Sequence, residues 1–148
     1  MCIRDRMRAG NILLNVVRDV AIDSEGNVYV ADAGNRRIIK TNEHLYVVTA
    51  SWATTPGGSL QEGPGGVTVD SAGNVYFTDI TNKLVRKRSK DGSQDVSWKP
   101  TGADALNIPA GLAVDYAGYV YVADRGAARI TVFGPTGSVV THFNFASN

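Results

Sequence analysis

Three aspartates stand at the same place in a block that the sequence repeats, and their carboxylates are its first candidates for chemistry. The block covers Val20–Asp32, Val67–Asp79 and Leu112–Asp124. A ring of carboxylates at one face could hold a cation or a cationic ligand. Alternatively, each side chain accepts backbone N–H bonds in the following turn, helped by a basic residue of the next strand. Because every repeat has this residue, we expect the structural role for Asp32, Asp79 and Asp124, and likewise for the turn residues Asp23, Asp70 and Asp115.

Basic and tryptophan side chains beside the repeats are the candidates for ligand binding. Cations on loops that line one face could engage phosphates or acidic peptides. The tryptophans are expected in the loops between repeats, where they serve either as interface anchors or as plugs between sheets. A further cluster of cations could instead be a charged outer strand that avoids edge pairing; it contains Lys83, Arg86, Lys87, Arg88 and Lys90. The candidate binding residues are Arg36, Arg37, Lys83, Arg125, Trp52 and Trp98.

Residues for nucleophilic or metal catalysis are sparse. His44 and His142 are far apart in the sequence and fall in outer-strand regions, and we expect neither to have an acidic or cysteine partner, so we expect surface histidines rather than a triad or a zinc site. No serine has a nucleophile-elbow context, and no glycine-rich loop precedes a helix. The single cysteine, Cys2, excludes an intrachain disulfide and a thiolate metal cluster. We therefore expect no catalytic residue and no cofactor, with a divalent cation as the one alternative.

The repeat itself predicts the fold. Asp70 follows Asp23 by 47 residues and Asp115 follows Asp70 by 45. Such a period with strand-like content is the signature of propeller blades. Each unit contains four short segments of strand character, which in the first unit are 20–22, 28–31, 37–40 and 45–49. We expect an all-β chain of three propeller blades, each made of four antiparallel strands.

The blades are expected at about residues 16–52, 63–100 and 108–146, within a propeller segment of residues 11–148. The first residues match no repeat and lack the apolar core of a signal peptide, so residues 1–10 are expected to be an unstructured or non-native leader. Three blades are too few to close a propeller. Either this is an incomplete propeller from a longer chain, or two copies associate to complete a six-blade ring.

Composition limits the partners only broadly. A hydrophobic content of 43% and a charged content of 20% are typical of a globular protein. The net charge of +1 gives no global field for nucleic acid or an anionic membrane, although a local patch remains compatible with it. No stretch approaches the roughly 18 apolar residues of a membrane span. The compartment is left open.

The loops after the second strands carry a family resemblance. They read Asp32-Ala-Gly-Asn35-Arg-Arg37-Ile38, Asp79-Ile-Thr-Asn82-Lys-Leu84-Val85 and Asp124-Arg-Gly-Ala127-Ala-Arg129-Ile130. This pattern resembles the NHL family, whose blades end a strand in aspartate and follow it with asparagine and an Arg-Ile-type pair. The second unit lacks the arginine and the third lacks the asparagine. The resemblance covers about residues 16–145 and implies a propeller, in a family that includes RNA-binding, protein-binding, sensor and lyase domains.

A second, local resemblance begins at Glu62-Gly63-Pro64. Together with the strands that follow, it looks like the start of the gluconolactonase/senescence-marker propellers, in which that glutamate ligates a divalent cation. Such a cation would polarise a lactone carbonyl and activate water. The family pattern then needs an asparagine where this sequence has Ala110, and Asn107 is displaced by three positions. Glu62 alone would supply one carboxylate, whereas Ca²⁺ binds six to eight oxygen ligands.

These patterns lead to three functional hypotheses. The first is a non-catalytic NHL-type module that binds a protein, glycan or other ligand through its loop faces. The second is a metal-dependent lactonase or lyase with Glu62 as a ligand. The third is an RNA-binding domain, which predicts strongly salt-dependent binding to single-stranded RNA.

Overall fold

The computed structural model describes residues 13–42, 48–53 and 63–144, and within them it contains β-strands, turns and short 3₁₀ segments but no α-helix. The strands form three separate four-stranded sheets in which neighbours along the chain pair antiparallel. The expected all-β architecture of three four-stranded blades is confirmed. Nothing in the described residues resembles a membrane-spanning helix.

Each sheet is built from consecutive strands in chain order. The first contains β1 (Val17–Ile22), β2 (Val28–Asp32), β3 (Arg37–Thr41) and β4 (Val48–Ala53). The second contains β5 (Pro64–Val69), β6 (Val75–Asp79), β7 (Leu84–Arg88) and β8 (Asp95–Trp98). The third contains β9 (Pro109–Val114), β10 (Val120–Asp124), β11 (Arg129–Phe133) and β12 (Val139–Asn144).

The turn between the first two strands of each sheet explains why the repeat begins with aspartate. In the first sheet, Asp23 Oδ1 accepts the backbone N–H of Glu25 and of Asn27, both at 2.9 Å. Its Oδ2 accepts the Asn27 side-chain amide at 2.9 Å and the Tyr29 hydroxyl at 3.0 Å. Gly26 has φ 81°, a left-handed conformation that glycine adopts without steric cost. Asp70 and Asp115 accept the same set of turn N–H groups and the hydroxyls of Tyr76 and Tyr121.

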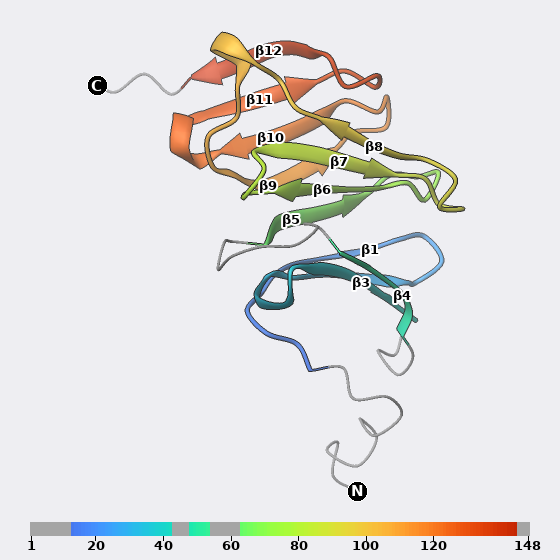
Figure 1. The fold of residues 1–148 in the computed structure, drawn as a ribbon. Coiled ribbons are helices and arrows are strands. Elements are labelled where there is room, and N and C mark those ends of the chain that lie inside the picture. The colour runs from blue at the N-terminus through green and yellow to red at the C-terminus, as the bar shows by residue number, and fades with distance from the viewer. Residues whose placement is uncertain (1–12, 43–47, 54–62, 145–148) are drawn as a thin grey trace, which may run out of the picture.

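The three sheets stack one upon the next, from the first near the N-terminus to the third near the C-terminus (Figure 1). Strands β1, β5 and β9 lie next to one another through the stack. The Asp19 carboxylate accepts the Val67 N–H at 3.0 Å, and the Thr78 hydroxyl donates to the Ala110 carbonyl at 2.6 Å. The first contact joins β1 to β5, and the second joins β6 to β9.

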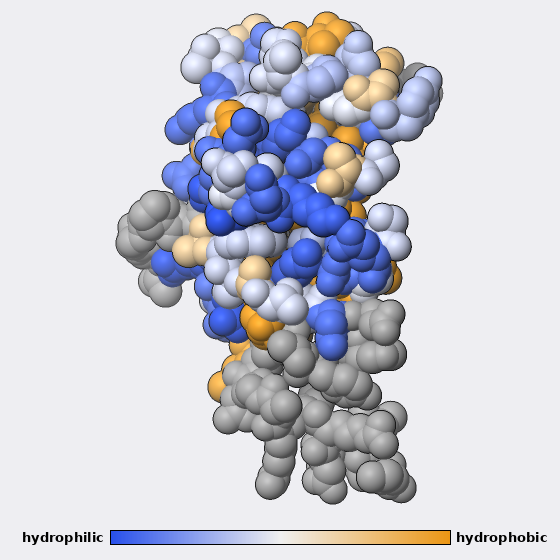
Figure 2. Space-filling view, turned by 90° about the vertical axis from the view of Figure 1, so that its right-hand side faces the viewer, coloured by the Kyte–Doolittle hydropathy of each residue, from blue (hydrophilic) through white to orange (hydrophobic). Residues whose placement is uncertain are grey.

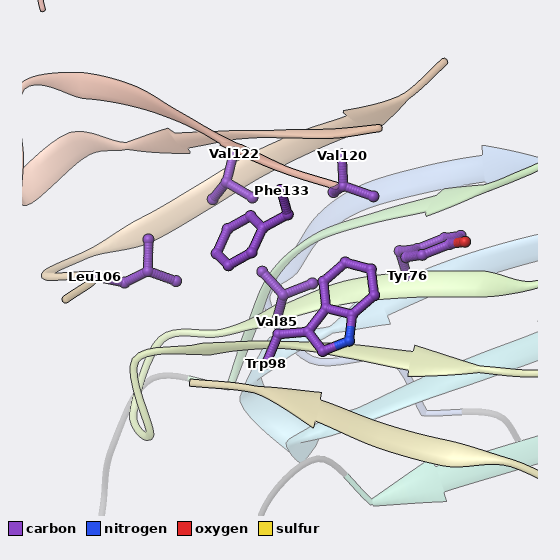
Figure 3. Packing of buried hydrophobic residues seen from close by; sticks show 7 residues of the cluster. All are labelled: Tyr76, Val85, Trp98, Leu106, Val120, Val122 and Phe133. Atoms are coloured by element: carbon purple, nitrogen blue, oxygen red, sulfur yellow. The ribbon is translucent and has the colours of Figure 1, made fainter. Parts of the chain in front are cut away.

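Hydrophobic core lies between the sheets. One cluster joins Tyr29, Ala31 and Ile38 of the first sheet to Val67, Val75 and Phe77 of the second. The other joins the second sheet to the third and contains Tyr76, Val85, Trp98, Leu106, Val120, Val122 and Phe133, which point toward one another in Figure 3. The second strands are therefore covered on both faces where a neighbour is present, as their continuous apolar runs predict.

Short 3₁₀ segments connect the second and third strands at one end of the stack. They are η2 (Ala33–Asn35) and η4 (Arg125–Ala127), and a third segment, η3 (Gly102–Asp104), lies between β8 and β9. The opposite end carries the turns between the first and second strands. Figure 2 looks onto the right-hand side of Figure 1, where hydrophilic residues cover the middle of the stack and hydrophobic ones are visible toward its two ends.

The last strand of the first sheet differs from the sequence prediction. We expected it at 45–49, of which 45–47 lie outside the described residues; β4 is Val48–Ala53 and so extends beyond the predicted end. A register shift between Lys40 and Thr41 accompanies the pairing of β3 with β4. As a result Trp52, expected in a loop, lies in the strand and pairs with Ile38.

Candidate functional site

The loops that carry most of the candidate residues are anchored by the buried aspartates at the ends of the second strands. Asp32 is fully buried and accepts the Asn15 N–H at 2.8 Å, the Asn35 side-chain amide at 2.8 Å and the Arg37 Nε–H at 2.7 Å. Arg37 also donates to the Leu13 carbonyl at 3.2 Å. Arg37 therefore closes the loop onto its aspartate, which accounts for it as a structural residue.

The equivalent aspartates of the other sheets serve the same purpose with different donors. Asp124 is fully buried and accepts the N–H groups of Asn107 and Ile108 at 3.1 and 2.9 Å. Arg129 Nε lies 3.8 Å from its carboxylate. Asp79 accepts both the backbone and the side-chain N–H of Asn82, at 3.0 and 2.9 Å. The carboxylates are thus engaged by the fold, as the structural interpretation of the sequence requires.

The residue that ends each of these loops has a left-handed backbone. Arg36 has φ 53°, Lys83 φ 55° and Ala128 φ 50°. A non-glycine residue in this region is uncommon and is held there by its surroundings. The N–H groups of these three residues donate to the carbonyls of Ala33, Ile80 and Arg125. The loops are therefore rigid platforms, and two of the three corners carry a cation.

One set of contacts joins the corner of the second sheet to η4 of the third. Lys83 Nζ donates to Asn107 Oδ1 at 3.5 Å, and Asn107 Nδ2 donates to the Gly126 carbonyl at 3.0 Å. The Arg125 N–H donates to the Ile108 carbonyl at 3.0 Å. Lys83, Asn107 and Arg125 are all exposed. We call this set the Lys83–Asn107–Arg125 junction; it brings Lys83 of the second sheet close to the loop of the third sheet that carries Arg125.

The two tryptophans occupy equivalent register positions, because Trp52 pairs with Ile38 and Trp98 with Val85. Trp98 is 6% exposed and lies between the second and third sheets, with its ring 5.7 Å from Phe133 and 5.8 Å from Tyr76 (Figure 3). Trp52 is partly exposed and stacks on Tyr29 at 6.2 Å. This packing matches the plug alternative for both residues.

The cations of β7, and Lys90 after it, are engaged by contacts within the chain. Arg86 and Arg88 both pair with Asp95, at 2.8 and 3.1 Å. Arg88 also lies over the Trp52 ring, and Lys87 lies over the Tyr76 ring. Lys90 pairs with Glu25 of the first sheet. Cations held in this way are poor candidates for a phosphate-binding surface.

The structure gives His142 partners that the sequence did not reveal. Its Nε2 lies 2.8 Å from Asp104 Oδ1, and its Nδ1 lies 3.2 Å from the Thr131 hydroxyl. The expectation that His142 has no acidic partner is therefore wrong; Asp104 lies 38 positions away and reaches it through η3. The order Thr–His–Asp resembles a catalytic triad, but Thr131 is fully buried and cannot attack a substrate.

The turn aspartates hold their tyrosines as neutral donors. Burial raises the pKa of Tyr29, and its hydrogen bond to the Asp23 carboxylate raises it further. For Asp23, burial acts to raise the pKa, but the Asn27 and Tyr29 hydrogen bonds outweigh it and the pKa falls below its usual value. The Asp23 carboxylate thus stays charged and the Tyr29 hydroxyl stays protonated, and their hydrogen bond stabilises the turn.

The described residues do not fit a divalent cation. They contain no group of three His, Cys, Asp or Glu side chains that could hold a metal ion. Ala110 occupies the position at which the gluconolactonase pattern requires asparagine. The displaced Asn107 instead accepts a hydrogen bond from the Lys83 ammonium group, which disfavours a second cation at the same oxygen. Glu62 lies outside the described residues.

Repeated four-stranded sheets stacked through their inner strands, with rigid loops at one end, define a β-propeller protein. Residues 9–148 match the family described as SMP-30/Gluconolactonase/LRE-like region, and the chain belongs to that family. The local resemblance at Glu62–Pro64 pointed in this direction, whereas the NHL assignment stays a prediction. No curated protein sequence matches the chain.

Solved structures show the same fold at low identity. A catalytically inactive virginiamycin B lyase from Staphylococcus aureus, determined with quinupristin, has a TM-score of 0.69 and 16% identity over 87% of this chain and 41% of its own. Kuenenia stuttgartiensis hydrazine synthase has a TM-score of 0.69 and 14% identity over 93% of this chain and 39% of its own. The chain thus spans about two fifths of the length of these structures.

Proposed function

We propose that this chain is a non-catalytic, ligand-binding segment of a propeller, and that it binds an anionic group at the Lys83–Asn107–Arg125 junction. The observation that supports this is the hydrogen-bonded series from Lys83 through Asn107 to Gly126. It brings two cationic residues of different sheets to one exposed place on rigid loops. Recognition sites commonly use loops held by such a scaffold.

The chemistry of the junction suits a carboxylate or phosphate. The exposed Lys83 ammonium supplies up to three donors, and the exposed Arg125 guanidinium presents a planar fork that matches either anion. The Asn107 amide accepts a hydrogen bond from Lys83. Arg36 extends the candidate surface at the corresponding corner of the first sheet, whereas Arg37 and Trp98 are accounted for by the loop and the core.

Calorimetric titration with sodium gluconate and with inorganic phosphate tests this proposal. The double variant Lys83→Ala/Arg125→Ala should lose at least tenfold in affinity without a change in melting temperature, because both side chains are exposed. Lys87→Ala/Lys90→Ala is the matched control, since it also removes two positive charges but away from the junction. Equal affinities for the two variants, or no binding of either anion by the natural chain, would contradict the proposal.

The family match favours a second function, a metal-dependent lactonase or lyase with Glu62 as a ligand. The described residues supply no further ligands for such a metal, so this chain would need donors from elsewhere. Titration with Ca²⁺ or Zn²⁺, followed by an assay of glucono-lactone hydrolysis, distinguishes this function from binding alone. Tight metal binding that the substitution Glu62→Gln abolishes would support the metal-dependent function. A titration that releases no heat of binding would rule this function out.

A further inference from the structure

The two interfaces between sheets are copies of one contact. In each, one sheet contributes a tyrosine, an aliphatic residue and a tryptophan at equivalent register positions, which we call its aromatic side. The next sheet contributes mainly aliphatic residues of its first two strands, together with a phenylalanine, and we call this its aliphatic side. The aromatic sides contain Tyr29, Ile38 and Trp52 in the first sheet and Tyr76, Val85 and Trp98 in the second.

The third sheet presents the same aromatic side, and no other sheet of the described residues covers it. Tyr121 occupies the position of Tyr29 and Tyr76, and Phe143, which pairs with Ile130, occupies the position of the tryptophans. Tyr121 is 37% exposed and Phe143 is 54% exposed, whereas Tyr29 and Tyr76 are each 1% exposed. Side chains that form core elsewhere in the chain are thus left in contact with solvent.

The first sheet leaves its aliphatic side partly uncovered in the same manner. Val20 and Ile22 face the same side of the sheet as Val30 and Val28, with which they pair. They are 57% and 65% exposed, while Val67, the counterpart of Val20 in the second sheet, is 3% exposed. The first and third sheets therefore carry the two complementary halves of the contact that is formed twice within the chain.

We propose that a second copy of this chain docks head to tail, its first sheet covering the aromatic side of the third sheet. The contact would continue the interface already formed twice within the chain, with Val20 and Ile22 against Tyr121 and Phe143 in place of Val67 and Val69 against Tyr29 and Trp52. A head-to-tail contact closes a ring when rotation permits and otherwise extends. Two copies related by a two-fold axis would complete six blades.

Light scattering coupled to size-exclusion chromatography measures the assembly directly. The natural chain should give twice the monomer mass of 15.8 kDa. Dilution should shift its elution later, toward the monomer position. Phe143→Asp and Ile22→Asp should each give the monomer mass, because each places a charge in the contact. Both residues are exposed in the single chain, so circular dichroism and melting temperature should be unchanged.

Mixing the two variants tests the polarity of the contact. Phe143→Asp retains an intact first sheet and Ile22→Asp retains an intact third sheet, so an equimolar mixture should regain dimer mass through one good contact. A face-to-face dimer of third sheets would instead be lost only in Phe143→Asp, and mixing would leave that variant monomeric beside an Ile22→Asp dimer. That result, or a natural chain that remains monomeric at high concentration, would overturn the proposal.

Discussion

Replacement of Trp98 by alanine should destabilise the protein strongly, since this side chain fills the space between the second and third sheets. It is 6% exposed and contacts the rings of Tyr76 and Phe133. Its indole also packs against Gly137, where an added Cβ would lie 2.2 Å from Nε1. Truncation of a buried tryptophan in a close-packed core costs about 3–5 kcal/mol, because lost burial and the residual cavity both contribute.

Urea denaturation followed by far-UV circular dichroism measures this loss without depending on tryptophan fluorescence. Trp52→Ala is the matched control, because Trp52 has the equivalent register position but is partly exposed. We expect the free energy of unfolding to fall by about 3–5 kcal/mol for Trp98→Ala and by roughly half as much for Trp52→Ala. Equal losses, or a loss below about 1 kcal/mol for Trp98→Ala, would refute the assignment of Trp98 as a plug between blades.

Two further predictions concern buried polar groups. Asp124→Ala should lower the unfolding free energy by about 3 kcal/mol, measured by the same denaturation, because it leaves the Asn107 and Ile108 N–H groups without an acceptor; an unchanged midpoint would contradict this. Burial, together with the Asp70 charge and hydrogen bond, raises the pKa of Tyr76 above its usual value of about 10. Folding then favours the protonated phenol, so this residue's contribution to stability is complete below about pH 10 and declines above it by about 1.4 kcal/mol per pH unit. Tyr76→Phe should reduce that decline when denaturation is measured between about pH 9 and 11, and an identical decline in the variant would contradict the prediction.

The strands and their turns could be predicted because each depends on local chemistry. Asp23 binds the N–H groups of its own turn, and Gly26 supplies the left-handed position, so a short segment determines its conformation almost alone. The repetition of that segment then implies the sheets. The structural role of Asp32 was also accessible, since its partners Asn35 and Arg37 follow within five positions.

Contacts between sheets could not be predicted in the same way. His142 meets Asp104 across 38 positions, and Lys83 meets Asn107 across 24. Neither pairing can be predicted from the spacing of the repeats, because Asp104 and Asn107 both lie in the segment that connects β8 of the second sheet to β9 of the third. The position of Trp52 was wrong for a related reason: its place in β4 follows from its pairing with Ile38 of β3, and the sequence around Trp52 alone does not specify that register.

The near-neutral composition is compatible with a cationic site because of how the acids are used. The chain has 14 acidic and 15 basic residues, but Asp23, Asp79 and Asp124 accept mainly N–H and hydroxyl donors of the fold. Their charges are buried or confined to turns, whereas Lys83 and Arg125 are exposed at one end of the stack. A local positive potential can therefore exist on a protein with a net charge of +1.

This distribution separates the anion site from the proposed self-association by their response to salt. Binding of phosphate near Lys83 and Arg125 places exposed opposite charges together, and added salt should weaken it as the screening length falls from about 10 Å at 0.1 M toward 3 Å at 1 M. The contact between Ile22 and Phe143 is apolar, and a strongly excluded salt such as sulfate should strengthen it. Dimer mass that falls with sodium sulfate would mean that charge, rather than the uncovered blade faces, holds the copies together.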